Sequence, residues 1–195
     1  MEGSQIYTNI SNIIDMIKDV IELNRGEIDA IVQQYEPGKV MTVWKGMRRT
    51  LPQSAFPSLE IEPSSGSTEW NTVYTQSPSY SLDMTLTINT NNDSMSVEYI
   101  GTLTRMLTEL FNNPANMSLD IPHETSWLPN QGYVKTRIQD AFVDSVTYNA
   151  TKDGLIRVSQ WGWYCKVLEG IEQSWRDNEG LEKTVYNPHE LPPLA

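Results

Sequence analysis

Few residues in this 195-residue chain belong to the types that usually carry chemistry. Glu60 and Glu62 stand two positions apart in a proline-bracketed stretch that predicts a strand, so their carboxylates share one face. Such a pair can bind Mg²⁺ or divide acid and base work between its members. The lysine and third carboxylate of a nuclease-type site are not nearby in the sequence, so we interpret the pair as a wet strand face. A small metal-dependent hydrolase that uses both glutamates stays as an alternative.

The histidines and the cysteine do not suggest a second kind of site. His123 and His189 have no further histidine or cysteine at ligand spacing, which argues against zinc or non-haem iron. Cys165 lies among tryptophans within a predicted strand, where cysteine usually fills a small apolar space, and no base partner for a nucleophile is evident. Neither common phosphate-binding glycine pattern occurs. We therefore predict no metal site, no cofactor and no enzymatic activity.

Composition narrows the class of protein. The chain carries 14 basic and 25 acidic residues, a net charge of −11, and such a chain repels the phosphate backbone of nucleic acids. Its hydrophobic fraction of 38% is low for a compact monomer and indicates either long loops or surface that is buried in an assembly. A single cysteine excludes an internal disulfide and points to a reducing compartment. We expect no signal peptide and no membrane segment.

Helical spacing marks two parts of the chain. Apolar residues recur every three or four positions from Ile6 to Ile21, which predicts a helix with Ser4 as its N-cap. Around Gly26 the helix either bends or gives way to a second short helix that starts at Glu27. The other helix is expected to begin at Asp93 or Ser94 and to end at Phe111, just before Asn-Asn-Pro.

The clearest period-two alternation runs from Tyr80 to Ile88 and predicts a strand at the centre of a sheet, with one face on the core. Residues 57–62, 70–76 and 79–90 are predicted as three strands, separated by a turn at Ser64–Ser67 and a break at Ser77–Pro78. A short strand is predicted over Val40–Trp44.

Two further strands are predicted to form a closing hairpin, residues 142–148 with residues 155–168. Before them lies a long polar loop, Asn113–Gly132, in which Met117–Ile121 is a candidate strand. Loops of this length are usually functional or ordered by a partner.

The return strand of the hairpin has an apolar pattern that changes along its length. Ile156 and Val158 occupy even positions, whereas Trp161 and Trp163 occupy odd ones, so either a bulge lies near Gln160 or both faces are covered. We favour coverage by another subunit or by an arm of the chain, which makes Trp161 and Trp163 candidate interface residues.

The chain has one basic cluster, formed by Lys45, Arg48 and Arg49. It is interpreted either as a solvated face or as a contact for an acidic partner surface.

These elements together predict an α+β fold. We expect a mixed or mostly antiparallel sheet of four to five strands with two main helices packed on one face. Residues 1–170 form this single domain, and residues 171–195 form an extended, acidic, proline-containing tail.

The order of elements resembles the tail-terminator or tail-completion proteins of long-tailed bacteriophages. A leading helix, the strand Phe56–Ile61, the strand Tyr80–Ile88 that runs straight into the helix Ser94–Phe111, and a closing hairpin carry the resemblance over roughly residues 1–170. It implies a hexameric ring that stops growth of the tail tube and presents the surface for the head connector. The long loop Asn113–Gly132 and the acidic tail depart from this pattern.

The implied partners are further copies of this chain, the tail-tube protein and a head connector or stopper protein. DNA would pass through an acidic ring without specific binding. The implied location is the virion neck, with assembly in the host cytoplasm. A head-completion or adaptor protein between portal and tail, and a monomeric binding module, are the alternatives without catalysis.

Overall fold

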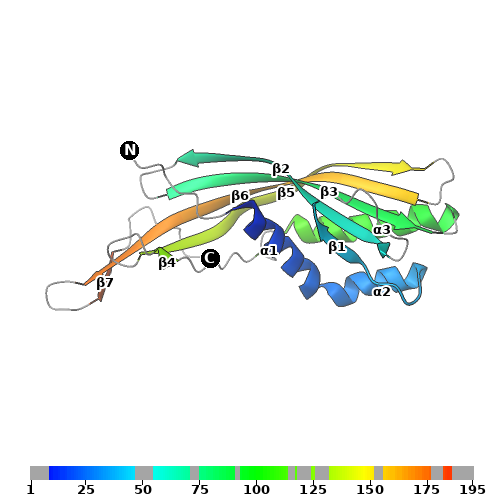
Figure 1. Cartoon of the computed structure of the whole chain (residues 1–195), viewed down its shortest axis with the longest axis horizontal. Coiled ribbons are helices and arrows are strands. Elements are labelled where there is room, and N and C mark those ends of the chain that lie inside the picture. The colour runs from blue at the N-terminus through cyan, green and yellow to red at the C-terminus, as the bar shows by residue number, and fades with distance from the viewer. Residues whose placement is uncertain are drawn as a thin grey trace.

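The computed structural model describes residues 9–46, 55–70, 75–90, 93–113, 117, 124–125, 132–151, 156–176 and 182–185. Its elements, in chain order, are helices α1 (Ile10–Leu23) and α2 (Arg25–Tyr35), strands β1 (Thr42–Lys45), β2 (Ser58–Trp70) and β3 (Thr75–Asn89), helix α3 (Asp93–Phe111), and strands β4 (Glu124–Thr125), β5 (Gly132–Ala150), β6 (Ile156–Arg176) and β7 (Glu182–Val185). Figure 1 shows a long twisted sheet with the helices below it.

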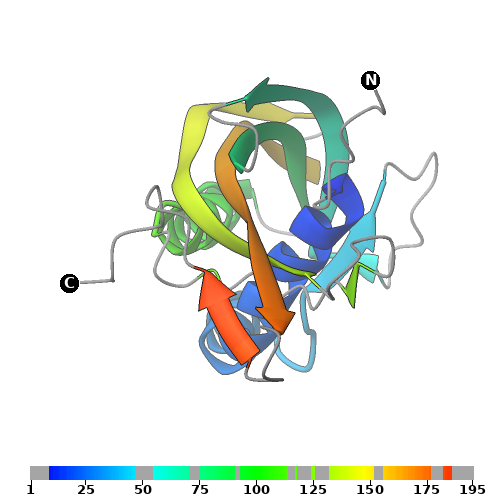
Figure 2. The same ribbon diagram turned by 90° about the vertical axis from the view of Figure 1, so that its left-hand side faces the viewer.

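The described strands form one mixed sheet in the order β1-β2-β3-β6-β5-β4, with β7 paired to β6. All pairings are antiparallel except β1 with β2, which is parallel. Seen end-on, the sheet curls around one side of the helices (Figure 2). The α+β class, the mixed sheet and the placement of helices on one face are confirmed.

The strand predicted as the centre lies inside the sheet, between β2 and β6. Its alternating side chains are almost fully buried: Tyr80 7%, Leu82 0%, Met84 1%, Leu86 0% and Ile88 0% exposed. Helices α1 and α3 contribute to the same core, among others with Ile13, Ile17 and Ile21 of α1 and Leu103, Leu107 and Phe111 of α3. The core is therefore one layer between the sheet and the helices.

The N-terminal helix starts later than predicted. Asn9 is its N-cap and forms a capping box with Asn12, in which each side chain accepts a hydrogen bond from the other residue's backbone N–H, at 3.0 and 3.1 Å. Ser4 lies outside the described residues, and the helix begins at Ile10 instead. At the other end the chain forms a second helix, which begins at Arg25 rather than Glu27.

The β2–β3 hairpin is longer and simpler than predicted. Residues 70–76 are not a separate strand, because β2 reaches Trp70 and β3 starts at Thr75. The predicted turn at Ser64–Ser67 lies inside β2, which carries a bulge between Pro63 and Ser65, and the predicted break at Ser77–Pro78 lies inside β3. Proline and small polar residues suggest turns, but β2 tolerates them because β1 covers only Ser58–Ile61 on its other side. In β3, Ser77 and Pro78 pair with β2 and have no partner residues in β6.

The closing hairpin also extends beyond its predicted ends. β6 runs across the boundary expected at residue 170 and continues to Arg176, where Gln173–Arg176 pair with β7. The described part of the predicted tail is therefore a further hairpin. In the long loop, Glu124–Thr125 form β4 and pair with Gly132 and Tyr133; most of the predicted strand Met117–Ile121 lies outside the described residues.

Candidate assembly surfaces

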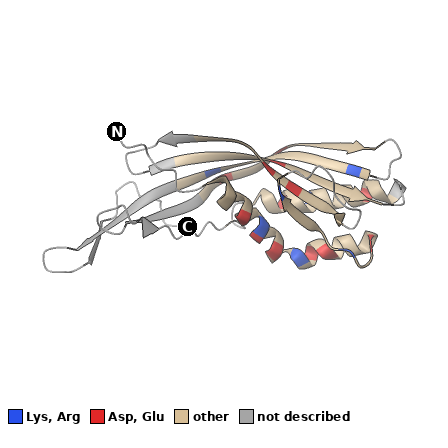
Figure 3. Ribbon diagram, viewed as in Figure 1, with Lys and Arg blue, Asp and Glu red and all other residues tan. Residues whose placement is uncertain are grey.

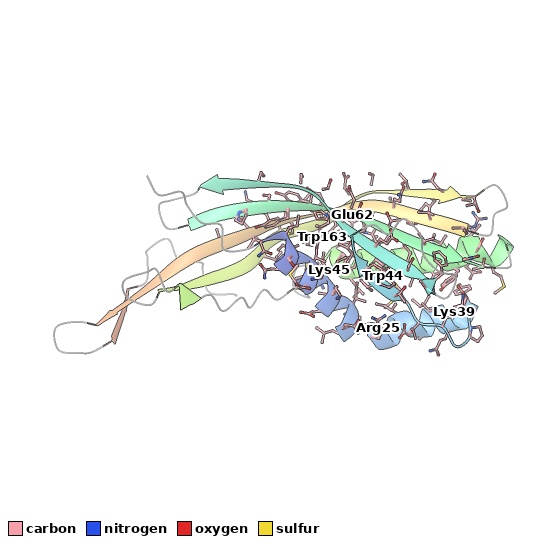
Figure 4. All side chains as sticks on the ribbon, in the orientation of Figure 1. Arg25, Lys39, Trp44, Lys45, Glu62 and Trp163 are labelled. Atoms are coloured by element: carbon pink, nitrogen blue, oxygen red, sulfur yellow. The ribbon has the colours of Figure 1, made fainter. Side chains whose placement is uncertain are left out.

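The two tryptophans predicted at an interface lie in the core of the chain itself. Trp161 and Trp163 are 3% and 1% exposed. The indole Nε1 of Trp163 donates a hydrogen bond to the backbone oxygen of Phe111 at 3.0 Å, which ties β6 to the end of α3. Figure 4 shows Trp163 between the sheet and the helices. In this conformation the pair offers almost no surface to a neighbouring copy.

The apolar switch along β6 arises from a polar residue in the core. The register of β6 with β3 does not shift from Ile156 to Gly170, so β6 itself has no bulge near Gln160; the bulge in this region lies in β5, opposite Trp161–Trp163. Ser159 faces the same side as Trp161 and is completely buried, while Val158 is half-buried on the opposite face. A serine in a core position thus interrupts the apolar alternation, and coverage of the other face by another subunit stays a prediction.

The described part of the basic cluster is one residue that already has a partner. Lys45, labelled in Figure 4, forms an ion pair with Asp15 of α1, and both side chains are about half exposed. The pair joins β1 to the first helix. Arg48 and Arg49 lie outside the described residues, so a basic contact surface for a partner stays a prediction.

The predicted pair of glutamates lies on the sheet face opposite to the core. In the register of β2 with β3, Glu60 stands opposite Thr85 and Glu62 stands opposite Asp83. The sheet thus supplies a third carboxylate that the sequence order did not reveal. Glu60 is only 6% exposed, so the expected wet strand face was wrong for this residue. Within the described residues, no group of three histidine, cysteine or carboxylate side chains is arranged to hold a metal ion.

Cys165 is placed as the sequence predicted. It is completely buried, and burial raises the pKa of its thiol to about 12, although a hydrogen bond from the Tyr80 backbone acts in the opposite direction. The thiol is therefore protonated at neutral pH, whereas a nucleophilic cysteine needs its thiolate form.

Charged residues gather on the helical layer. In Figure 3, acidic and basic residues mark α1 and α2, while the described parts of the strands carry few charges. Several of these charges pair locally: Arg25 with Glu22, Lys39 with Glu36, and Arg105 with Glu109 of α3. The Arg105–Glu109 pair is largely exposed and contributes little to stability, whereas the Glu36 side chain is only 10% exposed.

The exposed large apolar side chains that matter most lie on β5. Phe142, Val146 and Tyr148 are 44%, 37% and 56% exposed. The Phe142 ring stacks on Tyr164 of β6 at a centroid distance of 4.9 Å. Sequence reasoning counted Phe142, Val146 and Tyr148 as one face of a strand. It missed their exposure because bulges in β5, between Ile138 and Asp140 and between Val143 and Val146, shift the alternation.

Among the described residues, two long strands lack a partner strand along most of one side, although the Val143 N–H of β5 donates a hydrogen bond to Asn112 Oδ1 at 2.7 Å. β5 pairs with β6 along its length, but on its other side β4 pairs only with Gly132 and Tyr133. β2 pairs with β3, and on its other side β1 covers only Ser58–Ile61. Open strand edges are templates for pairing with another chain.

Comparisons with known proteins give a match for the fold but none for the sequence. No family model and no curated protein sequence matches this chain. Among solved structures, a chain of the "Virion of native gene transfer agent (GTA) particle" superposes with a TM-score of 0.52 and 7% sequence identity, covering 85% of this chain and 100% of that chain. At this identity the likeness shows a shared fold. In the part of the chain that the structure describes, none of the helices has the length and apolar character needed to cross a bilayer.

Proposed function

We propose that this chain is a structural virion protein, a tail terminator that forms a ring at the head-proximal end of a phage tail tube and joins the tube to the head connector. The observation that carries the proposal is the fold shared with a whole chain of a gene transfer agent virion, which agrees with the element order of tail-terminator proteins. The neighbour supports a virion component, and the resemblance supplies the position in the tail.

The surface chemistry of the chain supports an assembly role. A subunit of a closed ring needs two different patches, one for each neighbour. Among the described residues, the sheet offers two different strands that lack a partner strand along most of one side, β2 and β5, and the second carries large apolar side chains. The net charge of −11 suits a ring through which DNA slides, because acidic side chains repel phosphate. The ring would reside in the virion after assembly in the host cytoplasm.

Electron microscopy of particles that lack this chain tests the role. A terminator stops the growth of the tube, so its loss is expected to give overlong tubes without heads. Tails of normal length that fail to join heads would instead indicate the alternative, a head-completion or adaptor protein between portal and tail. Capture by immobilised tail-tube protein, against capture by immobilised portal, separates the same two roles. Complete particles that form without this chain would overturn the proposal.

The enzymatic alternative has a separate test. Titration calorimetry with Mg²⁺, Mn²⁺ and Zn²⁺ is expected to show no heat of binding, because no metal-holding group lies among the described residues. A measured heat that disappears in a Glu60→Gln, Glu62→Gln double variant, and persists in a Glu98→Gln, Glu109→Gln control on α3, would favour the hydrolase.

A further inference from the structure

We propose that neighbouring copies of this chain join through their sheets, with the open edge of β5 in one copy pairing antiparallel with the open edge of β2 in the next. This inference rests on the proposed ring and names the contact that closes it. The contact is main-chain hydrogen bonding between two strands, with side chains of unlike size packed across the junction.

Strand direction supports this arrangement. β2, β3, β6 and β5 are adjacent in that order, and each neighbouring pair is antiparallel. β2 and β5 therefore run in opposite directions within one copy. Rotation about a ring axis preserves the strand directions, so a sheet that continues from copy to copy brings β5 against β2 in the antiparallel sense.

The two edges also complement one another in size. From Pro63 to Ser67, the β2 edge consists of proline, serine and glycine, all exposed. On the β5 edge, Phe142 supplies a bulky side chain that is 44% exposed and stands level with Ser65 across the sheet. Large side chains that cross a junction onto glycine and serine fill the space that small residues leave, as aromatic side chains do for edge glycines.

The rows of the sheet bring the two edges to a common level. Gly66 pairs with Tyr80, Tyr80 with Cys165, and Cys165 with Ala141. The open part of β2 thus lies level with the middle of β5 in the next copy when the sheet continues without stagger. Val146 and Tyr148 lie level with Ile61 and Leu59, where β1 already pairs with β2, so the contact is made by the part of β5 that precedes them.

Both strand edges also have features that limit pairing between identical edges. The bulges in β5 divide its edge into short regular stretches, and Pro63 removes one N–H from β2. Short pairable stretches disfavour open-ended stacking of identical edges, so one complementary edge is selected.

Cross-linking of cysteine variants tests the pairing. The only native cysteine is buried, so introduced thiols are the ones that react. Phe142→Cys and Asp140→Cys variants on β5, which stand level with Ser65 and Ser67 across the sheet, are each mixed with Ser65→Cys and Ser67→Cys variants on β2, and treated with a short thiol–thiol cross-linker. Purified variants are mixed at high protein concentration. Variants that are produced together are cross-linked in assembled virions. We expect β5–β2 dimers from at least one combination, and a ladder of linked copies from the matching double variant.

The outcomes separate this inference from the function that it depends on. Links that form within the β5 variants alone would show two-fold pairing of identical edges and overturn the proposal. Rings or particles that contain the chain but give no β5–β2 link would overturn the edge contact and leave the ring role intact. Absence of the chain from every particle and every oligomer would overturn both.

Charged substitutions give an independent measure. Gln139→Lys combined with Phe142→Lys places two ammonium groups on the part of the β5 edge that stands level with the open part of β2, and is expected to weaken self-association at least ten-fold, since lysine on an edge blocks strand addition. Leu23→Lys combined with Val97→Lys is the matched control, because these side chains are 83% and 56% exposed and lie on helices. Circular dichroism checks that both variants keep the fold. Equal weakening by both variants would overturn the proposal.

Discussion

β6 and β5 are neighbours in one sheet, yet side chains that stand opposite one another in the two strands differ strongly in their exposure to solvent. Trp161 of β6 is 3% exposed, whereas Val146, directly opposite it on β5, is 37% exposed. Ser159 is completely buried, whereas its partner Tyr148 is 56% exposed. The helical cover still reaches β5 at Ala141, which is 5% exposed, but it ends before Val146 and Tyr148. The same apolar alternation thus builds a core where a helix lies above it and leaves free surface where none does.

The largest expected difference between these regions is in side-chain truncation. Trp163→Ala should lower the free energy of unfolding by about 3–5 kcal/mol, because it leaves a cavity and an unpaired Phe111 carbonyl. Phe142→Ala on the open edge should cost less than about 1 kcal/mol, since the ring is half exposed. Urea unfolding followed by tryptophan fluorescence measures both. Equal costs would contradict the division into core and open edge.

Because the Cys165 thiol is buried, the free energy of unfolding should decrease at alkaline pH. Burial raises the pKa of Cys165 to about 12 in the folded chain, above the ordinary thiol value. The folded chain therefore retains a proton that the unfolded chain has lost, and this contribution to stability is complete below about pH 8.5 and disappears as pH rises toward 12.

A Cys165→Ala variant should have a lower free energy of unfolding at neutral pH. Between about pH 9 and about pH 10.5, its free energy of unfolding should fall less steeply with pH than that of the native chain. The difference in slope is at most about 1.4 kcal/mol per pH unit, the value for one proton. Native protein should also resist a thiol reagent that reacts at once after unfolding. Rapid labelling of the native chain would show that the face beneath the helices is open.

A substitution at the N-cap of α1 should have an intermediate effect on the free energy of unfolding. Asn9→Ala removes the capping box that pairs Asn9 with Asn12 and should cost about 1 kcal/mol. Asn9→Ser keeps an N-cap side chain and should recover most of this loss. Chemical denaturation of the three proteins gives the comparison, and a neutral Asn9→Ala would mean that the helix does not depend on this start.

The smallest effect is expected at the ion pair between β1 and α1. Lys45→Met should change stability by no more than about 0.5 kcal/mol, because both side chains of the pair are about half exposed to water. If Lys45 also contacts an acidic partner, the same variant should reduce binding to that partner while leaving the unfolding midpoint unchanged. A large drop in stability would place the pair among the core contacts.

Sequence patterns predicted the parts of the fold in which the alternation was strong. The structure contains the predicted strand Tyr80–Ile88, the predicted helix that ends at Phe111 and the predicted closing hairpin. Errors fell where one residue type suits two structures. Ser64–Ser67 and Ser77–Pro78 look like turns, and they lie inside strands since the edge of β2 and the pairing across β3 satisfy their backbone groups.

The candidate surfaces were harder to predict than the fold. Trp161 and Trp163 were expected at an interface because of the switch along β6, and Ser159 in a core position explains that switch. The exposed apolar residues of β5 belong to a strand whose bulges change which way its residues face. A bulge depends on the partner strand, so the sequence of β5 alone does not reveal it.

The sequence by itself determined the fold class, the central strand, the main helices and the acidic character of the chain, because period and charge are properties of short stretches of residues. The tertiary structure decided which apolar faces are covered, that Asp83 stands opposite Glu62, and that the short outer strands β1 and β4 cover only small parts of β2 and β5 among the described residues. Those features depend on strand order and register, which arise only when segments distant in the chain pair with one another.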